Sequence, residues 1–142
     1  MITFDDNDVQ SLCLCAWKEA RGEGTVGMLA VMQVICRRAA IWYGGHEGSI
    51  HEAVFGKNQF SSMSVPTDPE FNLEPLDGDA SYGFCQGCAV AVIEGTQPDV
   101  TGAALYYANL KQVTSGWFVD NIVNNPSEHP QTAVIGRQTF FA

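Results

Sequence analysis

Two carboxylates four positions apart, Glu19 and Glu23, are the side chains of this chain whose type and spacing most directly suggest chemistry. They enclose Arg21 and Gly22 at the point where a helical pattern ends. A carboxyl group at a helix end, beside a glycine that lets a ligand come close, is suited to donate a proton to a glycosidic oxygen. The same residue types also form an ordinary solvated helix end, because Glu, Ala and Arg favour helices and Gly stops them. The rest of the chain must decide between these interpretations.

Glu23 has two candidate roles. If the helix continued, Glu23 would share a face with Glu19 and could activate a water, as the second carboxylate of an inverting glycosidase does. Glycines at positions 22 and 24 interrupt the helix, which favours capping or hydrogen bonding at the turn. We keep Glu23 as a candidate substrate contact beside that structural role.

Two long helices are predicted before residue 45. Apolar residues recur at three- and four-residue spacing over residues 8–21, the pattern of an amphipathic helix. Thr25 can cap a second helix over residues 25–43, which is apolar almost all round. This second helix is therefore expected to be the buried central element.

The remaining elements are shorter. We predict helices over residues 49–54 and 79–94, and a long loop over a cleft between them, residues 55–76. Two aromatic or β-branched segments, residues 103–108 and 133–141, predict strands that pair with each other. The fold class is then α+β, mostly helical, with a small antiparallel β-ribbon.

Length and composition predict one domain, residues 1–142, because 142 residues with 46% hydrophobic side chains can bury one sizeable core. The formal net charge of −9 argues against non-specific binding to nucleic acid or to an anionic membrane. The N-terminus is acidic where a signal peptide would be basic, and Arg37 and Arg38 interrupt the longest apolar run. We therefore expect a protein made in the cytoplasm, without a signal peptide or membrane insertion.

The five cysteines are expected to be free and structural. Cys85 and Cys88 have the spacing of a zinc or redox pair, and Cys13 and Cys15 could complete a set of four metal ligands. All four instead lie in apolar helical patterns, where a free Cys behaves as a small core residue. We predict no metal site and no cofactor.

Aromatic side chains in the last third of the chain can stack on sugars. Tyr106 and Tyr107 are neighbours on a predicted strand, so at most one is expected to point into a given cleft while the other packs in the core. Trp117 and Phe118 can either stack on a sugar or be buried. The sequence favours neither Tyr106 nor Tyr107 as the one in the cleft, and for Trp117 and Phe118 burial is at least as well supported as stacking.

Four motifs follow one another along almost the whole chain. The motifs are the pentapeptide Glu19 to Glu23 followed by Gly27 and Ala30-Val31, then Gln59-Phe60-Ser61, then residues 98–103 leading to Tyr106-Tyr107, and finally Ile135-Gly136 before Phe140. In this order and spacing they resemble the SleB-type cell wall hydrolases, a family that includes spore cortex-lytic enzymes and related phage lysins.

The resemblance implies a lysozyme-like fold and cleavage of the glycan strand of peptidoglycan, which characterised relatives carry out as lytic transglycosylases. It implies that the first Glu of the pentapeptide, Glu19, is the catalytic acid, which afterwards acts as a base. The expected partner is the glycan strand, bound by a monomer. By the same resemblance the candidate substrate contacts, besides Glu23, are Gln59, Phe60, Ser61, Tyr106 and Tyr107.

The chain also departs from the family pattern. Cys36 stands before Arg37 where relatives usually have Asn, and Gln138 stands where relatives have His after the Ile-Gly step. The usual export signal and repeat-type wall-binding module are not seen in the sequence. We therefore expect a catalytic domain alone that acts on the wall after release, as a phage lysin does.

Two other functions stay open. A Cys-His amidase or endopeptidase would need an exposed thiol near a histidine, but His46, His51 and His129 show no paired spacing. A non-catalytic wall-binding protein would bind peptidoglycan without cutting it.

An anhydro-muramyl product is expected unless a second carboxylate faces Glu19 across the cleft. The acids whose position could provide one are Asp68, Glu70, Glu74, Asp77 and Asp79.

Overall fold

The computed structural model describes residues 2–142. A helical part comes first along the chain and a small sheet comes last. In chain order the elements are α1 (Asp6–Ala20), the 3-10 turn η1 (Arg21–Glu23), α2 (Gly24–Trp42), α3 (Ser49–Phe55), α4 (Ser61–Ser64), α5 (Ala80–Glu94), β1 (Tyr106–Ala108), the π-helical turn η2 (Val119–Val123), β2 (Gln131–Ile135) and β3 (Gln138–Phe141).

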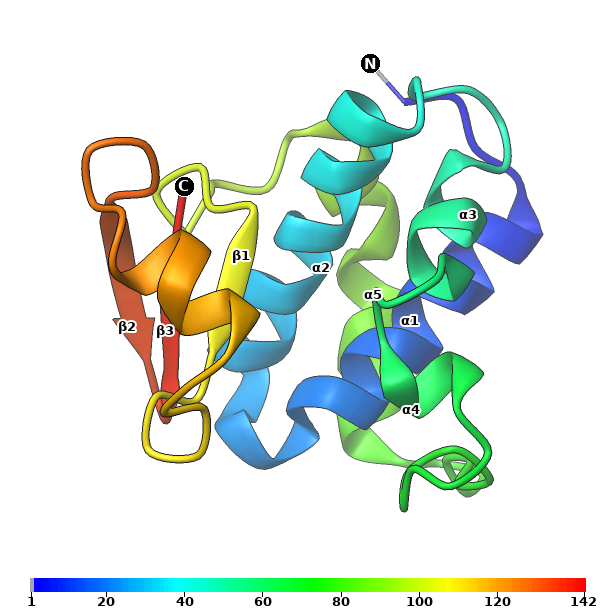
Figure 1. Cartoon of the computed structure of the whole chain (residues 1–142). Helices are drawn as coiled ribbons and strands as arrows, with labels where there is room; N and C mark the ends of the chain where they lie inside the picture. Colours follow the sequence, from blue (N-terminus) through cyan, green and yellow to red (C-terminus); the bar gives the residue numbers. More distant parts are fainter. Residues whose placement is uncertain (1) are drawn as a thin grey trace.

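Helix α2 lies at the centre of the molecule, with α1, α3 and α5 on one side and the sheet on the other (Figure 1). All of its residues from Gly27 to Cys36 are buried, because neighbours cover it on both sides. The exposed apolar side chains of α2, Val26, Ile41 and Trp42, lie near its two ends. The predicted buried central helix is therefore confirmed.

Helix α1 begins at a reciprocal pair of caps. The Asp5 carboxylate accepts from the Asp8 backbone N–H at 2.8 Å, and the Asp8 carboxylate accepts from the Asp5 N–H at 3.1 Å. Buried Asp8 also accepts from the backbone N–H groups of Gly48 and His51, which joins α1 to the start of α3. Burial acts to raise the pKa of Asp8, but these backbone donors outweigh it, so the pKa lies below its usual value.

The chain breaks between α1 and α2, as the glycines predict. The turn η1 follows α1, and Gly24 has a φ of +79°, which glycine adopts without strain. Helix α2 then begins at Gly24 with no side chain capping it. The predicted cap at Thr25 is wrong, because the turn runs directly into α2 and leaves Thr25 inside its first turn.

The segment expected to be one long loop, residues 55–76, contains the short helix α4. Phe60 and Met63 are buried in the helical core and anchor this segment beside α1. Lys18 on α1 reinforces the contact, since its Nζ donates to the carbonyl oxygens of Ser62 and Phe71 at 3.3 and 2.8 Å. The start of α4 is thereby fixed at the C-terminal end of α1.

The last third of the chain forms a three-stranded antiparallel sheet in the order β1-β3-β2. The prediction of one strand over residues 133–141 is wrong, because this segment turns at Gly136 and Arg137 and pairs with itself. Gly136 has a φ of +58°, as tight hairpin turns require. The other pairing is as expected and places Tyr107 opposite Phe140. The α+β class with a small antiparallel sheet is confirmed.

Two groups of buried apolar side chains share helix α2. The larger group joins α1, α2, α3 and α5 with the segment around α4. The smaller group joins α2 to the sheet and consists of Ala30, Val34, Ala104 and Phe140. Because α2 contributes to both groups, it fixes the position of the sheet relative to the end of α1.

The helical stretch Asp6–Trp42 is long and apolar enough to cross a membrane by length and composition alone. Core helices and signal sequences pass the same test. In this structure 67% of its most apolar window is buried within the protein. The packing of α2 between the other helices and the sheet therefore explains why this stretch is apolar.

Candidate functional site

The Glu19 carboxylate, at the C-terminal end of α1, is held by two hydroxyl groups. Ser62 Oγ donates to Glu19 Oε2 at 2.7 Å, and the Tyr107 hydroxyl donates to Oε1 at 2.8 Å. These partners come from α4 and β1, 43 and 88 residues further along the chain. A hydroxyl can donate to a carboxylate and accept from a carboxylic acid. The two partners therefore suit a group that gives up and regains a proton.

Tyr107 is a fixed and neutral partner of Glu19. Its ring stacks on Phe140, with centroids 5.5 Å apart and planes 30° from parallel. Burial, and then the neighbouring charge of Glu19, raise the pKa of Tyr107 well above its usual value. The phenol therefore keeps its proton and can hold the Glu19 carboxylate by a hydrogen bond throughout the neutral range.

The serine that contacts Glu19 is Ser62, which is not among the contacts predicted from the sequence. Its neighbour Ser61, the predicted contact, is exposed and donates to Asp68 Oδ2 at 2.6 Å. Successive residues of a helix point in different directions, so only one of the two serines can face α1. The apolar residues Phe60 and Met63, which pack in the core, are the sequence signal that could have identified Ser62 as the serine facing α1.

Glu23 lies in a different setting from Glu19. Its Oε1 accepts from Arg137 Nε at 2.8 Å, and its Oε2 accepts from the Arg137 backbone N–H at 3.0 Å. The Glu23 side chain is only 7% exposed. A Cβ added to Gly27 would approach Glu23 Cβ to 2.5 Å, and one added to Gly136 would meet the Glu23 carboxylate. Glu23 therefore ties the start of α2 to the β2–β3 hairpin.

A groove of about 630 Å³ runs between α2, the segment after α3 and strand β1. It shares Tyr107 with the Glu19 site. Two of its aromatic side chains remain well exposed, Trp117 at 64% and Trp42 at 40%, and offer flat apolar surfaces of the kind that bind ligands. Its lining consists of Arg38, Trp42, Asn58, Gln59, Tyr106, Tyr107, Trp117 and Phe118.

The other predicted contacts divide between this groove and the core. Gln59 lines the groove and accepts from Arg38 Nη1 at 3.2 Å. Phe60 does not, because it is 3% exposed and packs in the helical core. Tyr106 and Tyr107 both line the groove, so the expectation that at most one would do so is wrong.

Three of the acids considered as a second carboxylate have other partners, and two line other cavities. Asp68 accepts from Ser61 and from the Glu70 N–H, and these hydrogen bonds lower the pKa of Asp68. Glu70 pairs with Arg21. Asp79 caps α5 and accepts from the Trp17 indole N–H at 3.2 Å. Glu74 and Asp77 line other cavities. Among residues 2–142, none of these acids hydrogen-bonds to Glu19.

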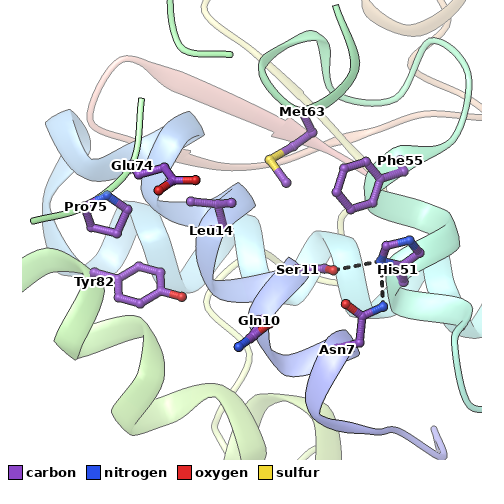
Figure 2. Close-up of a pocket in the computed structure, with 10 residues that line it drawn as sticks. All are labelled: Asn7, Gln10, Ser11, Leu14, His51, Phe55, Met63, Glu74, Pro75 and Tyr82. Atoms are coloured by element: carbon purple, nitrogen blue, oxygen red, sulfur yellow. Dashed lines mark hydrogen bonds between the residues drawn. The ribbon is translucent and has the colours of Figure 1, made fainter. Parts of the chain in front are cut away.

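A second cavity of about 360 Å³ lies beside the N-terminal half of α1 (Figure 2). There the Ser11 hydroxyl and the Asn7 amide both point at His51 Nδ1, at 2.9 and 3.1 Å. The amide nitrogen can only donate, so Nδ1 accepts. A serine nucleophile would need this histidine oriented through its other nitrogen. The described residues supply no such hydrogen bond to His51, so the geometry does not complete a hydrolytic triad.

The thiols do not form a nucleophilic site. All five cysteines are free, and Cys88 is the only one that is not fully buried. Burial raises the pKa of the Cys13, Cys36 and Cys85 thiols to about 12, which makes them poor nucleophiles. None lines the cavity that contains His51. Within residues 2–142, no three His, Cys, Asp or Glu side chains form a group that could hold a metal ion.

The two departures from the family pattern lie away from the groove. Cys36 is buried in α2, and Gln138 is paired with Ile135 at the start of β3. Neither side chain is part of the groove lining. The groove next to Glu19 is therefore built without either position.

Comparison with known proteins gives concordant results. The sequence is 29% identical over 139 residues to a spore cortex-lytic enzyme of Oceanobacillus iheyensis, and 28% identical over 138 residues to one of Halalkalibacterium halodurans. Each alignment covers 96% of this chain but only 42% and 35% of the two relatives, so the chain spans less than half of their length.

The fold matches a solved structure over nearly its whole length. The catalytic domain of the germination-specific lytic transglycosylase SleB from Bacillus anthracis superposes with a TM-score of 0.68 at 26% identity, covering 97% of this chain and 96% of that one. The sequence profile of the cell wall hydrolase family matches residues 22–141. The chain therefore belongs to the cell wall hydrolase family.

Proposed function

We propose that this chain degrades peptidoglycan by cleaving the glycosidic bond between MurNAc and GlcNAc, with Glu19 as the general acid. The observation that carries this proposal is the Glu19 carboxylate, held by two hydroxyl groups next to a groove with exposed aromatic side chains. Relatives named as spore cortex-lytic enzymes and a structural neighbour named as a lytic transglycosylase support the same class of reaction.

In the proposed reaction Glu19 gives its proton to the glycosidic oxygen as the bond from that oxygen to the muramyl anomeric carbon breaks. The Glu19 carboxylate then takes a proton from a hydroxyl of the same muramyl ring, and that oxygen bonds to the anomeric carbon. No water is consumed, and Glu19 ends protonated as it began. Ser62 and Tyr107 hold the carboxyl group and can exchange donor and acceptor roles as the proton moves.

A transglycosylase of this kind needs one carboxyl group, and the surroundings of the other acids support that choice. An inverting hydrolase would need a second carboxylate free to activate water. Glu23 is instead held by Arg137, and the acids between residues 68 and 79 have partners of their own or line other cavities. We therefore favour an anhydro-muramyl product over a reducing end.

Glycan binding is assigned to the groove beside Tyr107. Trp42, Tyr106 and Trp117 offer aromatic faces to sugar rings, and the amides of Asn58 and Gln59 can hydrogen-bond to hydroxyl and acetamido groups. Gln59, Tyr106 and Tyr107 therefore remain proposed substrate contacts. Phe60 would support the groove from the core, and Glu23 and Ser61 would act on the structure around it.

The setting in which the enzyme works is also a proposal. We propose that residues 1–142 act as one catalytic domain and as a monomer, with peptidoglycan as the partner. The net charge of −9 disfavours nucleic acid and anionic membranes as ligands. Cytoplasmic synthesis followed by release to the wall, as in a phage lysin, fits this chemistry and stays a prediction.

The bond that is cut distinguishes the proposal from its alternatives. Purified sacculi are incubated with the protein, and soluble disaccharide fragments, newly exposed amino groups and protein bound to sediment are measured in parallel. The proposal predicts soluble glycan fragments with no new amino groups. New amino groups with intact glycan would show an amidase or endopeptidase, and binding without release would show a non-catalytic protein.

A further inference from the structure

Arg38 is a buried cation that has no carboxylate partner within residues 2–142. It is 8% exposed, whereas the other three arginines pair with Glu70, Asp99 and Glu23. The ionisable groups with the largest influence on the pKa of Arg38 are phenols and a thiol, which are neutral near pH 7. Burying a guanidinium without a counter-charge is costly, so a buried cation of this kind points to a ligand that supplies the charge.

The Arg38 guanidinium is held in one orientation before any ligand arrives. Its Nε donates to the Leu105 carbonyl at 2.7 Å, and its Nη1 donates to Gln59 Oε1 at 3.2 Å. The Cζ atom lies 5.2, 5.4 and 5.8 Å from the ring centroids of Trp42, Phe60 and Tyr106. Nη2 has no hydrogen-bond partner among the described residues. A donor edge that is fixed and incompletely used is suited to bind a carboxylate.

The groove around Arg38 favours an anion. Its lining contains aromatic side chains and two amides, and within residues 2–142 it contains no Asp or Glu, although the whole chain carries a net charge of −9. Arg38 is the one formally charged side chain in that lining. Tyr107 lines the same groove and donates to Glu19, so an anion bound at Arg38 would lie in a groove that shares Tyr107 with the Glu19 site.

We propose that Arg38 binds a carboxylate carried by the substituent on O3 of the muramyl sugar. This inference rests on the proposed function and adds a basis for choosing between the two sugars of the strand. The muramyl ring carries a lactyl group that ends in a carboxylate or in a peptide bearing one, and GlcNAc carries neither. Binding at Arg38 would place the muramyl ring, rather than its neighbour, next to Glu19.

The test compares soluble probes that differ in this charge. Binding of N-acetylmuramic acid, its methyl ester, N-acetylglucosamine and N-acetylmuramyl-alanyl-isoglutamine is measured by NMR titration with the wild type, Arg38→Met and Arg37→Gln. Arg37 is the matched control, because it lies next to Arg38 on α2 but pairs with Asp99 away from the groove. The wild type should bind N-acetylmuramic acid or the muramyl peptide about 10- to 100-fold more tightly than the ester.

Arg38→Met should lose this preference, and Arg37→Gln should keep it. Which acidic probe binds more tightly shows whether the lactyl or the peptide carboxylate is used. Equal binding of acid and ester by the wild type, or no measurable binding of either acidic probe, would overturn the proposal. So would a preference that survives in Arg38→Met. If Arg38→Met does not fold, Arg38→Lys replaces it and should reduce the preference by losing the forked donor edge.

Lysis of sacculi is measured separately with the same proteins. Lysis by a wild type that shows no preference for the acid would defeat the Arg38 proposal and leave the proposed function intact. A preference for the acid without lysis would defeat the proposed function instead. A role for Arg38 that is only structural would lower the unfolding midpoint of Arg38→Met without removing the difference between acid and ester.

Discussion

The end of α1 around Glu19 and the start of α2 around Glu23 place two carboxylates of one pentapeptide in opposite surroundings. Glu19 is held by the neutral hydroxyls of Ser62 and Tyr107. Glu23 is held by the guanidinium and backbone N–H of Arg137, and its side chain is almost fully buried. A cation favours the charged form of its partner, whereas a hydroxyl can bond to either form. This difference in partners favours Glu19 over Glu23 as the proposed proton donor.

The turn between them directs each charged side chain to a different element. Arg21 stacks on Trp17, with Cζ 4.1 Å from the ring centroid, and pairs with Glu70. Glu19 reaches α4 and β1, and Glu23 reaches the β2–β3 hairpin. A continuous helix would have placed Glu19 and Glu23 on one face. The break at η1 and Gly24 is therefore what allows the two carboxylates to differ.

The largest expected effect is that of Glu19→Gln. The amide keeps the volume of the side chain but cannot donate the catalytic proton, so the rate of lysis should fall by at least ~10²–10⁴-fold. Turbidity of sacculi measures the rate, and circular dichroism checks that the fold is retained. Substantial lysis by a folded Glu19→Gln variant would show that Glu19 is not the catalytic carboxylate.

Removing one hydroxyl partner should have a smaller effect. Tyr107→Phe or Ser62→Ala leaves Glu19 with one partner and less precise placement, so the rate should fall about 10-fold or more. Ser61→Ala is the matched control, because its hydroxyl bonds to Asp68 instead. Its rate should equal that of the wild type. A loss of rate for Ser61→Ala with no loss for Ser62→Ala would instead support Ser61, the contact predicted from the sequence.

Glu23→Gln should affect stability more than rate. It replaces a charge-assisted pair with a neutral one, and Arg137 is 66% exposed, so the free energy of unfolding should fall by only about 1 kcal/mol. Urea unfolding measures this change, and the Arg137→Gln single and double variants complete a mutant cycle. A 100-fold loss of lysis at unchanged stability would instead make Glu23 a catalytic partner.

An effect that is absent at neutral pH and appears only in alkaline solution concerns Tyr107. The native pKa of Tyr107 is raised well above its unfolded value of about 10, so the native state keeps a proton that the unfolded state releases. This contribution is complete below pH 10 and is lost as pH rises through the native pKa. Stability should therefore fall above about pH 10 with a share of up to about 1.4 kcal/mol per pH unit from Tyr107. Urea titrations at several pH values should show that the free energy of unfolding of Tyr107→Phe falls less steeply with pH than that of the wild type. An equal slope would contradict a raised pKa for the buried Tyr107 phenol.

Local patterns were enough to predict the longer helices of the fold, although not the short helix α4. The apolar spacing before residue 21 and the all-round apolar segment after residue 25 identify α1 and buried α2, because burial imposes a helical period on the sequence. The glycines between them predict the break. The hairpin was missed because its two strands are both apolar and only Gly136 and Arg137 separate them.

The site was less predictable, because it depends on contacts between distant segments. Glu19 was found from its motif, but its partner Ser62 depends on how α4 packs, and the link between Glu23 and Arg137 spans 114 residues. From the sequence alone, Arg38 is recognisable only as an interruption of an apolar run. Its missing counter-charge becomes visible only when every neighbouring side chain is placed.

The most direct test of the central claim is the mass of the fragments released from purified sacculi by the wild type and by Glu19→Gln. The wild type should release muropeptides lighter by one water than the reducing forms from the earliest times, because a muramyl hydroxyl replaces water as the attacking group. Glu19→Gln should release none. Reducing ends alone from the wild type, or the same fragments from folded Glu19→Gln, would contradict a transglycosylase that relies on Glu19.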